Sequence, residues 1–278
     1  MKLSSKRLAV GLVICWAYAW RLGPPAFCAE APSQGLPPLR YEFPTFLAAS
    51  IYGKKAAGTN VLFTFKRRAK RSGNTLDVAR EFAYPDGKPA ARQHLIYEGD
   101  ALVLYELEEL QIGAKGTARL RRDPHHPEKD VILFEYSESA GAKPQARSER
   151  LQSDTLIDDM VGPFLASHWD LLMKGEKIKC RYVVIPRRET VGFTFFKKSE
   201  STWQGKPVVI VRMEATSPIV GAVVDPLFFA VEKAPAHLVL EYSGRTVPKT
   251  REGNKWRDLD AVTVFDWAST NRVDGGKR

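Results

Sequence analysis

The chain has 278 residues, with 42 Lys and Arg against 32 Asp and Glu, which gives a formal charge of +10. Hydrophobic residues make up 44% and charged residues 27%, an ordinary globular mixture that excludes a wholly disordered protein. With only 3 cysteines, a disulfide-rich scaffold is excluded as well. The length suits about two domains or one large all-β unit.

The first 29 residues have the three parts of a secretory signal peptide. A basic head precedes 13 uncharged residues, 8–20, whereas a membrane-spanning helix needs about 20. Small residues around Ala29 provide a cleavage site, whose position is open by a few residues. An uncleaved anchor and a lipoprotein acylated at Cys28 are the alternatives. The sequence therefore predicts a periplasmic protein, exported by a cleaved signal peptide.

Loss of this leader changes the charge and the cysteine count. The basic residues fall from 42 to 38 against 32 acidic ones, which lowers the formal charge from +10 to +6. Cys180 is then the only cysteine, so no internal disulfide can form and stability must come from an apolar core. Residues 30–44 contain four prolines and no periodicity, which predicts a tether before the folded domain.

The first half of the body has the composition of β-strands. Pro85-Asp86-Gly87 is a turn signal, and Glu98-Gly99-Asp100 separates two runs that predict a hairpin. No helical segment intervenes, so the strands should pair antiparallel. The expected strands cover residues 60–65, 76–84, 94–97, 101–107 and 131–136.

One helical signal lies in the middle of the chain, near residues 154–174. Apolar residues recur there at helical spacing, after Ser153-Asp154-Thr155 as N-cap candidates. Because proline cannot lie mid-helix without disruption, we expect a break at Gly162 and a second helix with Pro163 at its first position. Gly175 should end that helix.

The second half returns to strand composition. About a dozen strands and one helix predict a mainly β fold: a strongly curved antiparallel sheet, or half-open barrel, that wraps one central broken helix. We expect a single β-rich domain over residues 45–270 and a disordered tail over 271–278. The expected strands here cover residues 178–185, 191–196, 208–213, 227–231, 238–242 and 261–267.

Five segments carry a resemblance to an uncharacterised family of exported proteobacterial proteins: residues 161–164, 168–176, 182–188, 224–227 and 241–246. The likeness covers most of residues 84–249. It implies a periplasmic protein and brings no established activity. The strand-rich pattern with one helix is also similar to the half-open barrels of the lipoprotein carriers LolA and LolB, at the level of fold only and without a diagnostic motif.

No familiar catalytic motif is present, so the sequence predicts no catalytic residue, no metal site and no cofactor. Residues 123–128 hold two histidines and two carboxylates, which we interpret as a solvated turn. Ser167, His168 and Asp170 are too close in sequence for a catalytic triad on a helix. Cys180 lies between basic neighbours, but strand alternation would turn it inward as a small buried residue.

Two basic runs, residues 66–71 and 119–122, are interpreted as solvated edge strands that charge protects from aggregation. The alternative is contact with anionic lipid head groups or lipopolysaccharide. Export argues against a nucleic acid partner.

The most apolar stretch of the body, residues 219–229, is expected to be either a flap over an apolar cavity or a buried strand pair. Aromatic residues of the helix and the apolar stretch, together with strand arginines at a cavity mouth, are the candidate ligand contacts. These residues are Phe164, His168, Trp169, Arg187, Arg188, Phe228 and Arg245.

The leading hypothesis is a non-catalytic periplasmic binding module for an apolar or amphiphilic ligand, such as a lipid or an acyl chain. The expected partners are that amphiphile and the envelope membrane surface, and the protein is expected to be a monomer. The alternatives are an envelope structural or interaction protein without a small ligand and, third, a hydrolase with an unrecognised site.

Overall fold

The computed structural model describes residues 44–54, 59–222 and 224–272. The predicted leader, nearly all of the predicted tether and most of the predicted tail lie outside these residues.

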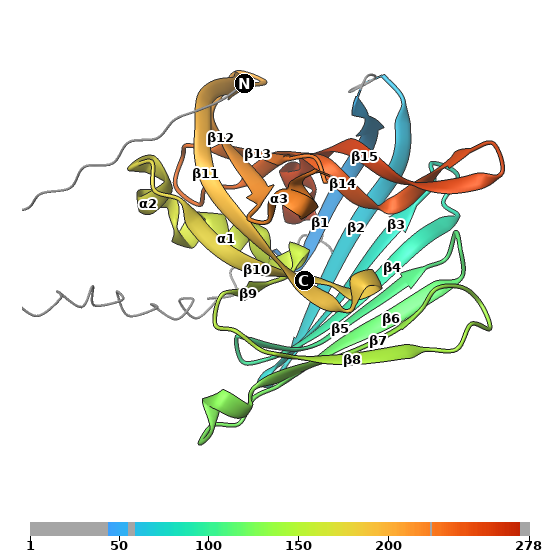
Figure 1. Ribbon diagram of the computed structural model, residues 1–278. Coiled ribbons are helices and arrows are strands. Elements are labelled where there is room, and N and C mark those ends of the chain that lie inside the picture. The colour runs from blue at the N-terminus through green and yellow to red at the C-terminus, as the bar shows by residue number, and fades with distance from the viewer. Residues whose placement is uncertain (1–43, 55–58, 223, 273–278) are drawn as a thin grey trace, which may run out of the picture. The chain divides into compact units, whose positions relative to one another are not determined.

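Fifteen strands form one sheet in the described part of the chain (Figure 1). The first eight are β1 (Phe46–Gly53), β2 (Val61–Ser72), β3 (Thr75–Ala83), β4 (Pro89–Glu98), β5 (Ala101–Glu109), β6 (Ala114–Arg121), β7 (Val131–Ser137) and β8 (Gln145–Arg150). The others are β9 (Thr155–Leu156), β10 (Ile178–Val184), β11 (Glu189–Trp203), β12 (Lys206–Ala215), β13 (Leu227–Glu232), β14 (Val239–Glu252) and β15 (Lys255–Asp266).

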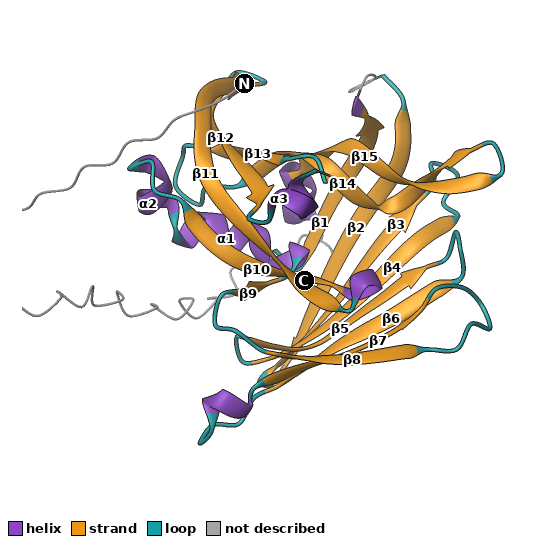
Figure 2. Cartoon of the chain, in the orientation of Figure 1, coloured by secondary structure: helices purple, strands orange, loops and turns teal. Residues whose placement is uncertain are grey.

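The sheet consists of two meanders joined in the middle. Strands β1 to β8 follow one another across one half and β9 to β15 across the other, and β1 pairs with β15 between them (Figure 2). Neighbouring strands are antiparallel, except that β9 runs parallel to β10. The predicted fold, a curved and mainly antiparallel sheet that does not close, is confirmed.

Side-chain burial alternates along the strands, as a sheet with one wet face requires. In β1 and β6, every second residue is buried against the core. The outer face of the first meander carries a row of alternating charge across five strands, in which each residue directly faces the next: Lys66, Glu81, Arg92, Glu108 and Lys115.

The two edges of the sheet are held together by side chains instead of strand pairing. Glu149 of β8 accepts hydrogen bonds from Arg181 of β10 and from the backbone N–H of Thr190 in β11. Arg147 of β8 forms an ion pair with Glu189 across the same seam. The short link from β8 to β9 also carries the chain from one edge to the other.

The helical segment lies on the concave face and comprises η3 (Asp158–Met160), α1 (Val161–Ser167) and α2 (Trp169–Met173). The predicted break at Gly162 is wrong: the helix breaks at His168, and Pro163 is the third residue of α1. Proline is tolerated there because first-turn N–H groups have no acceptor within the helix. The predicted end is confirmed, since the N–H groups of Gly175 and Glu176 bond the carbonyls of Leu172 and Leu171.

The interpretation of the basic runs as edge strands is wrong. Residues 66–71 belong to β2, which pairs with β1 and β3, and residues 119–121 belong to β6, which pairs with β5 and β7. Their outward basic residues lie on the wet face, whereas Arg67 is only 1% exposed and points into the core.

Three further helical turns lie between strands: η2 (Pro127–Lys129), η4 (Ile185–Arg187) and α3 (Pro218–Gly221). A fourth, η5 (Trp267–Arg272), follows β15. In the residues that the structure describes, no helix has the length and apolarity needed to cross a membrane.

Gly116 of β6 is required for the close approach of η4. A Cβ at this position would lie 2.6 Å from the carbonyl oxygen of Glu135 and 2.6 Å from Cγ2 of Ile185. We expect Gly116→Ala to lower the free energy of unfolding by about 1–3 kcal/mol through overpacking, as measured by chemical denaturation. Gly53→Ala is the control, because its Cβ would meet Leu62 at an ordinary 3.7 Å. Equal stability of the two variants would contradict this account of the η4 contact.

Candidate ligand-binding cavity

A cavity of about 1160 Å³ lies between the concave face of the sheet and the helical segment. Ligand pockets in proteins usually measure about 300–1,000 Å³, so this space suits a molecule of lipid size. The lining from α1 includes Val161, Pro163 and Ala166. Much of the rest comes from large apolar side chains of the sheet, among them Leu47, Phe65, Phe82, Phe193, Met213 and Phe229.

One end of the cavity is polar because the first meander places three polar residues in one buried row. Arg67 of β2 lies opposite Arg80 of β3, which lies opposite Gln93 of β4. All three line the cavity. Like charges directly opposite each other in a sheet are destabilising, so two adjacent inward arginines need carboxylates close by.

The helical segment supplies those carboxylates as two consecutive residues of η3. Asp159 accepts two hydrogen bonds from Arg67, at 2.7 Å from Nε and 3.2 Å from Nη2, and a third from the Tyr97 hydroxyl at 3.0 Å. Asp158 lies 2.5 Å from Nη1 of Arg80 and accepts a bond from the Gln93 amide at 3.2 Å. The two positive charges of the arginines and the two negative charges of the aspartates therefore balance.

Three tyrosines, Tyr105, Tyr182 and Tyr242, surround Asp158 and also line the cavity. Burial, followed by the charge of Asp158, raises the pKa of each hydroxyl above its ordinary value. All three therefore stay protonated at neutral pH and are available as hydrogen-bond donors. The Tyr242 hydroxyl already donates to the carbonyl of Arg245.

A second charged group lines another part of the cavity, on β5, β14 and β15. Lys249 lies 3.0 Å from Glu109 and 2.9 Å from Asp258, and Arg245 bonds Asp258 and Asp260. The buried Glu109 also accepts a hydrogen bond from Tyr136. The cations here are paired with carboxylates, as at the polar end.

The seven residues predicted as ligand contacts do not all lie together. Arg187 and Arg245 line the cavity, and Arg187 is paired with Glu189. Phe164 is 2% exposed and packs against Phe195 in the core. Trp169 stacks on His237, a lining residue, at 4.0 Å between ring centroids. Five of the seven are therefore outside the lining: Phe164, His168, Trp169, Arg188 and Phe228.

The apolar stretch 219–229 takes two forms. Its start belongs to α3, where Ile219 is 82% exposed, and its end belongs to β13. Leu227 and Phe229 point inward and line the cavity together with Val224, whereas Phe228 lies on the opposite side of the strand. Within the described residues, the stretch is thus partly a cavity wall and partly an exposed turn.

The other motifs weighed in the sequence form local contacts. Ser167 Oγ and His168 Nδ1 are 3.0 Å apart, and both lie within hydrogen-bond distance of the Phe164 carbonyl. His126 contacts Glu128 in an exposed loop. Burial raises the pKa of the Cys180 thiol to about 12, so this cysteine is a protonated core residue at neutral pH.

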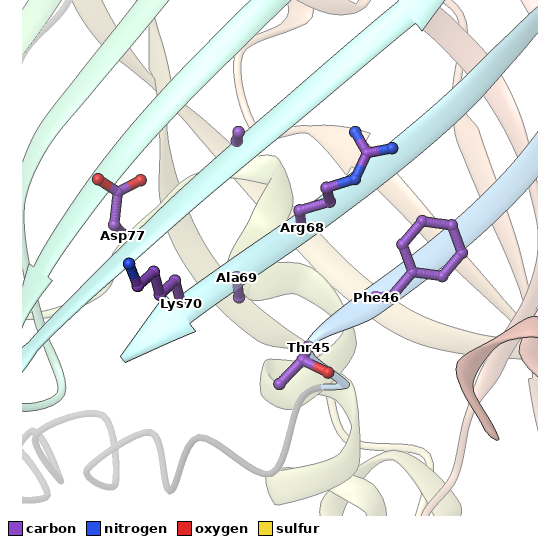
Figure 3. A pocket seen from close by; sticks show the side chains of 7 residues that line it. Thr45, Phe46, Arg68, Ala69, Lys70 and Asp77 are labelled. Carbon is purple, nitrogen blue, oxygen red and sulfur yellow. The ribbon is translucent and has the colours of Figure 1, made fainter. Parts of the chain in front are cut away.

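A smaller depression of about 580 Å³ lies where β1, β2 and β3 meet near the start of the domain (Figure 3). The Arg68 guanidinium lies over the Phe46 ring, 5.8 Å from its centroid. Lys70 and Asp77, which face each other in the β2–β3 register, form its other side.

No family model and no curated protein matches the chain. Several solved structures are similar to it at 7–12% identity. A β-barrel-like DUF1849 protein from Brucella abortus is 8% identical, with a TM-score of 0.37 over 80% of this chain and 94% of its own.

A DUF1329 protein from Desulfovibrio piger is 12% identical, with a TM-score of 0.27 over 81% and 85%. A domain described as outer-membrane lipoprotein sorting, from Vibrio parahaemolyticus, is 7% identical, with a TM-score of 0.24 over 83% and 89%. These scores are too low to transfer a function, so what the chain binds must be inferred from its own cavity.

Replacement of Asp159 by Asn should destabilise the protein strongly, because it leaves Arg67 buried without its counter-charge. We expect a loss of about 3–5 kcal/mol in the free energy of unfolding, measured by chemical denaturation. The control is Asp77→Asn, which removes an exposed carboxylate 3.2 Å from His94 and should cost less than about 1 kcal/mol. Similar losses in the two variants would show that the buried pair does not anchor the helical segment.

The tyrosine cluster predicts a loss of stability in alkali. Because the pKa of Tyr105, Tyr182 and Tyr242 is raised in the folded state, their contribution is complete below about pH 10, the unfolded value, and is lost as the pH rises towards the folded values. Spectrophotometric titration should show these tyrosinates appearing together with unfolding. Tyr182→Phe should weaken the alkaline decline. Ionisation of all three near pH 10 in a folded protein would refute the prediction.

Proposed function

We propose that this chain is a non-catalytic periplasmic binding protein that takes an apolar or amphiphilic ligand, such as a lipid or an acyl chain, into the cavity beneath its helical segment. The cavity of about 1160 Å³ is the observation that carries the proposal. Its apolar walls would exclude water from a hydrocarbon chain, and its polar groups would orient a head group.

The sequence supports the location and the organisation. The leader over residues 1–29 has the pattern of a cleaved signal peptide, and the body over residues 45–270 forms one β-rich domain in this proposal. An exported protein that binds lipid monomers would meet its ligand at the envelope membrane surfaces. We propose a monomer as the working form.

The first test is the content of the cavity in protein purified from the periplasm. We expect native mass spectrometry to show a mass above that of the mature chain, and solvent extraction to release the lipid that accounts for the difference. We also expect N-phenyl-1-naphthylamine, an apolar fluorescent dye, to bind with saturation. Clean apo protein that does not bind the dye would overturn the proposal.

A cavity-filling variant locates that binding. Ala166 lines the cavity from α1, so Ala166→Trp should place an indole in the space and raise the Kd of the dye at least about tenfold, or 1.4 kcal/mol. The matched control is Ala146→Trp on the exposed edge strand β8. Fluorescence titration measures both. Equal affinity for the dye in the two variants would place the dye elsewhere.

A further inference from the structure

The polar end of the cavity holds four charges that cancel: Arg67 and Asp159 are buried, whereas the Asp158 side chain is 24% exposed. Arg67 is paired with Asp159 through two hydrogen bonds, and its Nη1 also donates to the carbonyl of Pro44 at 2.9 Å. Arg80 is paired with Asp158 at 2.5 Å and also approaches Asp159 at 3.8 Å. The charge of each arginine is thus compensated by a carboxylate of this chain, although Arg80 Nε and Nη1 form no hydrogen bond with the described residues.

The same holds for the rest of the lining. Among the described residues, the other Lys and Arg side chains that line the cavity are Arg187, Arg245 and Lys249, and each faces at least one carboxylate. A carboxylate or phosphate placed inside would therefore meet no spare cation, and at the polar end it would lie beside two aspartates. A charge buried without a partner carries a large desolvation cost.

The polar end does, by contrast, contain hydrogen-bonding groups that are not fully used within the described part of the chain. Among the described residues, no group bonds the Tyr182 hydroxyl, although Tyr182 lines the cavity close to Asp158. The Tyr105 hydroxyl accepts a bond from the Gln93 amide at 2.6 Å, so its own proton remains available to an acceptor. The Gln93 Oε1 atom is buried and receives no hydrogen bond from the part of the chain that the structure describes. A buried acceptor without a donor, such as this oxygen, is costly, and a ligand hydroxyl that donates to it gains that energy.

We propose that the polar end receives an uncharged, oxygen-bearing head group, such as the hydroxyl and ester groups of a monoacylglycerol, in preference to a carboxylate or a phosphate. This inference rests on the proposed function, because it assumes that an acyl chain fills the apolar part of the cavity. The head group's oxygen atoms accept from Tyr182 and Tyr105, and its hydroxyl groups donate to oxygen atoms of the wall.

The test compares two probes with the same acyl chain, 1-monolauroylglycerol and laurate. Each competes with N-phenyl-1-naphthylamine for the protein at about pH 8, where a carboxyl group is ionised. We expect monolauroylglycerol to displace the dye at a concentration at least about tenfold lower than laurate, given the cost of burying an unpaired charge.

Two variants of the polar end should change this selectivity in different ways. Tyr182→Phe removes a donor and keeps the ring, so it should weaken the binding of monolauroylglycerol about fivefold relative to laurate, each measured against the dye affinity of the same variant. Asp158→Asn removes a negative charge beside Arg80. It should therefore increase the affinity for laurate about tenfold relative to that for monolauroylglycerol. Tyr52→Phe and Asp77→Asn are the matched controls outside the cavity lining and should behave as the unmodified protein.

The outcomes separate the two proposals. If the dye binds but laurate competes as well as monolauroylglycerol, or Tyr182→Phe and Asp158→Asn leave the selectivity unchanged, the head-group inference fails and the binding function stands. If neither the dye nor either lipid binds, the binding function itself fails. If Asp158→Asn does not fold, Tyr182→Phe still decides the inference.

Discussion

The bidentate pair between Arg67 and Asp159 is the contact on which the arrangement of the interior depends. Register places Arg67 opposite Arg80 on the buried face of two neighbouring strands, where their repulsion would oppose pairing. Two consecutive aspartates of η3 offset it. The sheet and the helical segment therefore depend on each other electrostatically as well as hydrophobically, and the helical segment docks with Asp158 and Asp159 against β2 and β3.

That docking explains why space remains beside the helical segment. A segment held at one end by charge cannot slide to fill the whole concave face, and α1 and α2 are short. The curvature of the sheet is maintained separately, at the seam where Glu149 of β8 meets Arg181 and Thr190. Between these two attachments, the large apolar side chains of the sheet line a cavity as well as a core.

The sequence predicted the class of fold because strand composition, turn residues and one helical period are local signals. It located most strands, but it missed β1, β8 and β9 and took the basic runs of β2 and β6 for edge strands. It misplaced the helix break because it started the helix too early: residues 155–160 form β9 and η3, so Pro163 falls in the first turn of α1. The polar end was missed for a different reason. The basic run 66–71 was interpreted as one solvated unit, whereas the period of two from Phe63 and Phe65 continues to Arg67. Its partner lies 92 residues away, and no local pattern indicates a pairing at that distance.

Charged residues have different roles on the outer and inner faces of the sheet. The outer row from Lys66 to Lys115 alternates in sign across five strands, but it is solvated, and each such pair is worth little. The inner charges are largely removed from water, so each needs a partner, and in the described part of the chain each cation that lines the cavity faces a carboxylate. The formal charge of +10 is therefore a poor guide to the ligand. What decides the chemistry of the cavity is that its charges are already balanced, which leaves hydrogen bonding and apolar contact as the means of recognition.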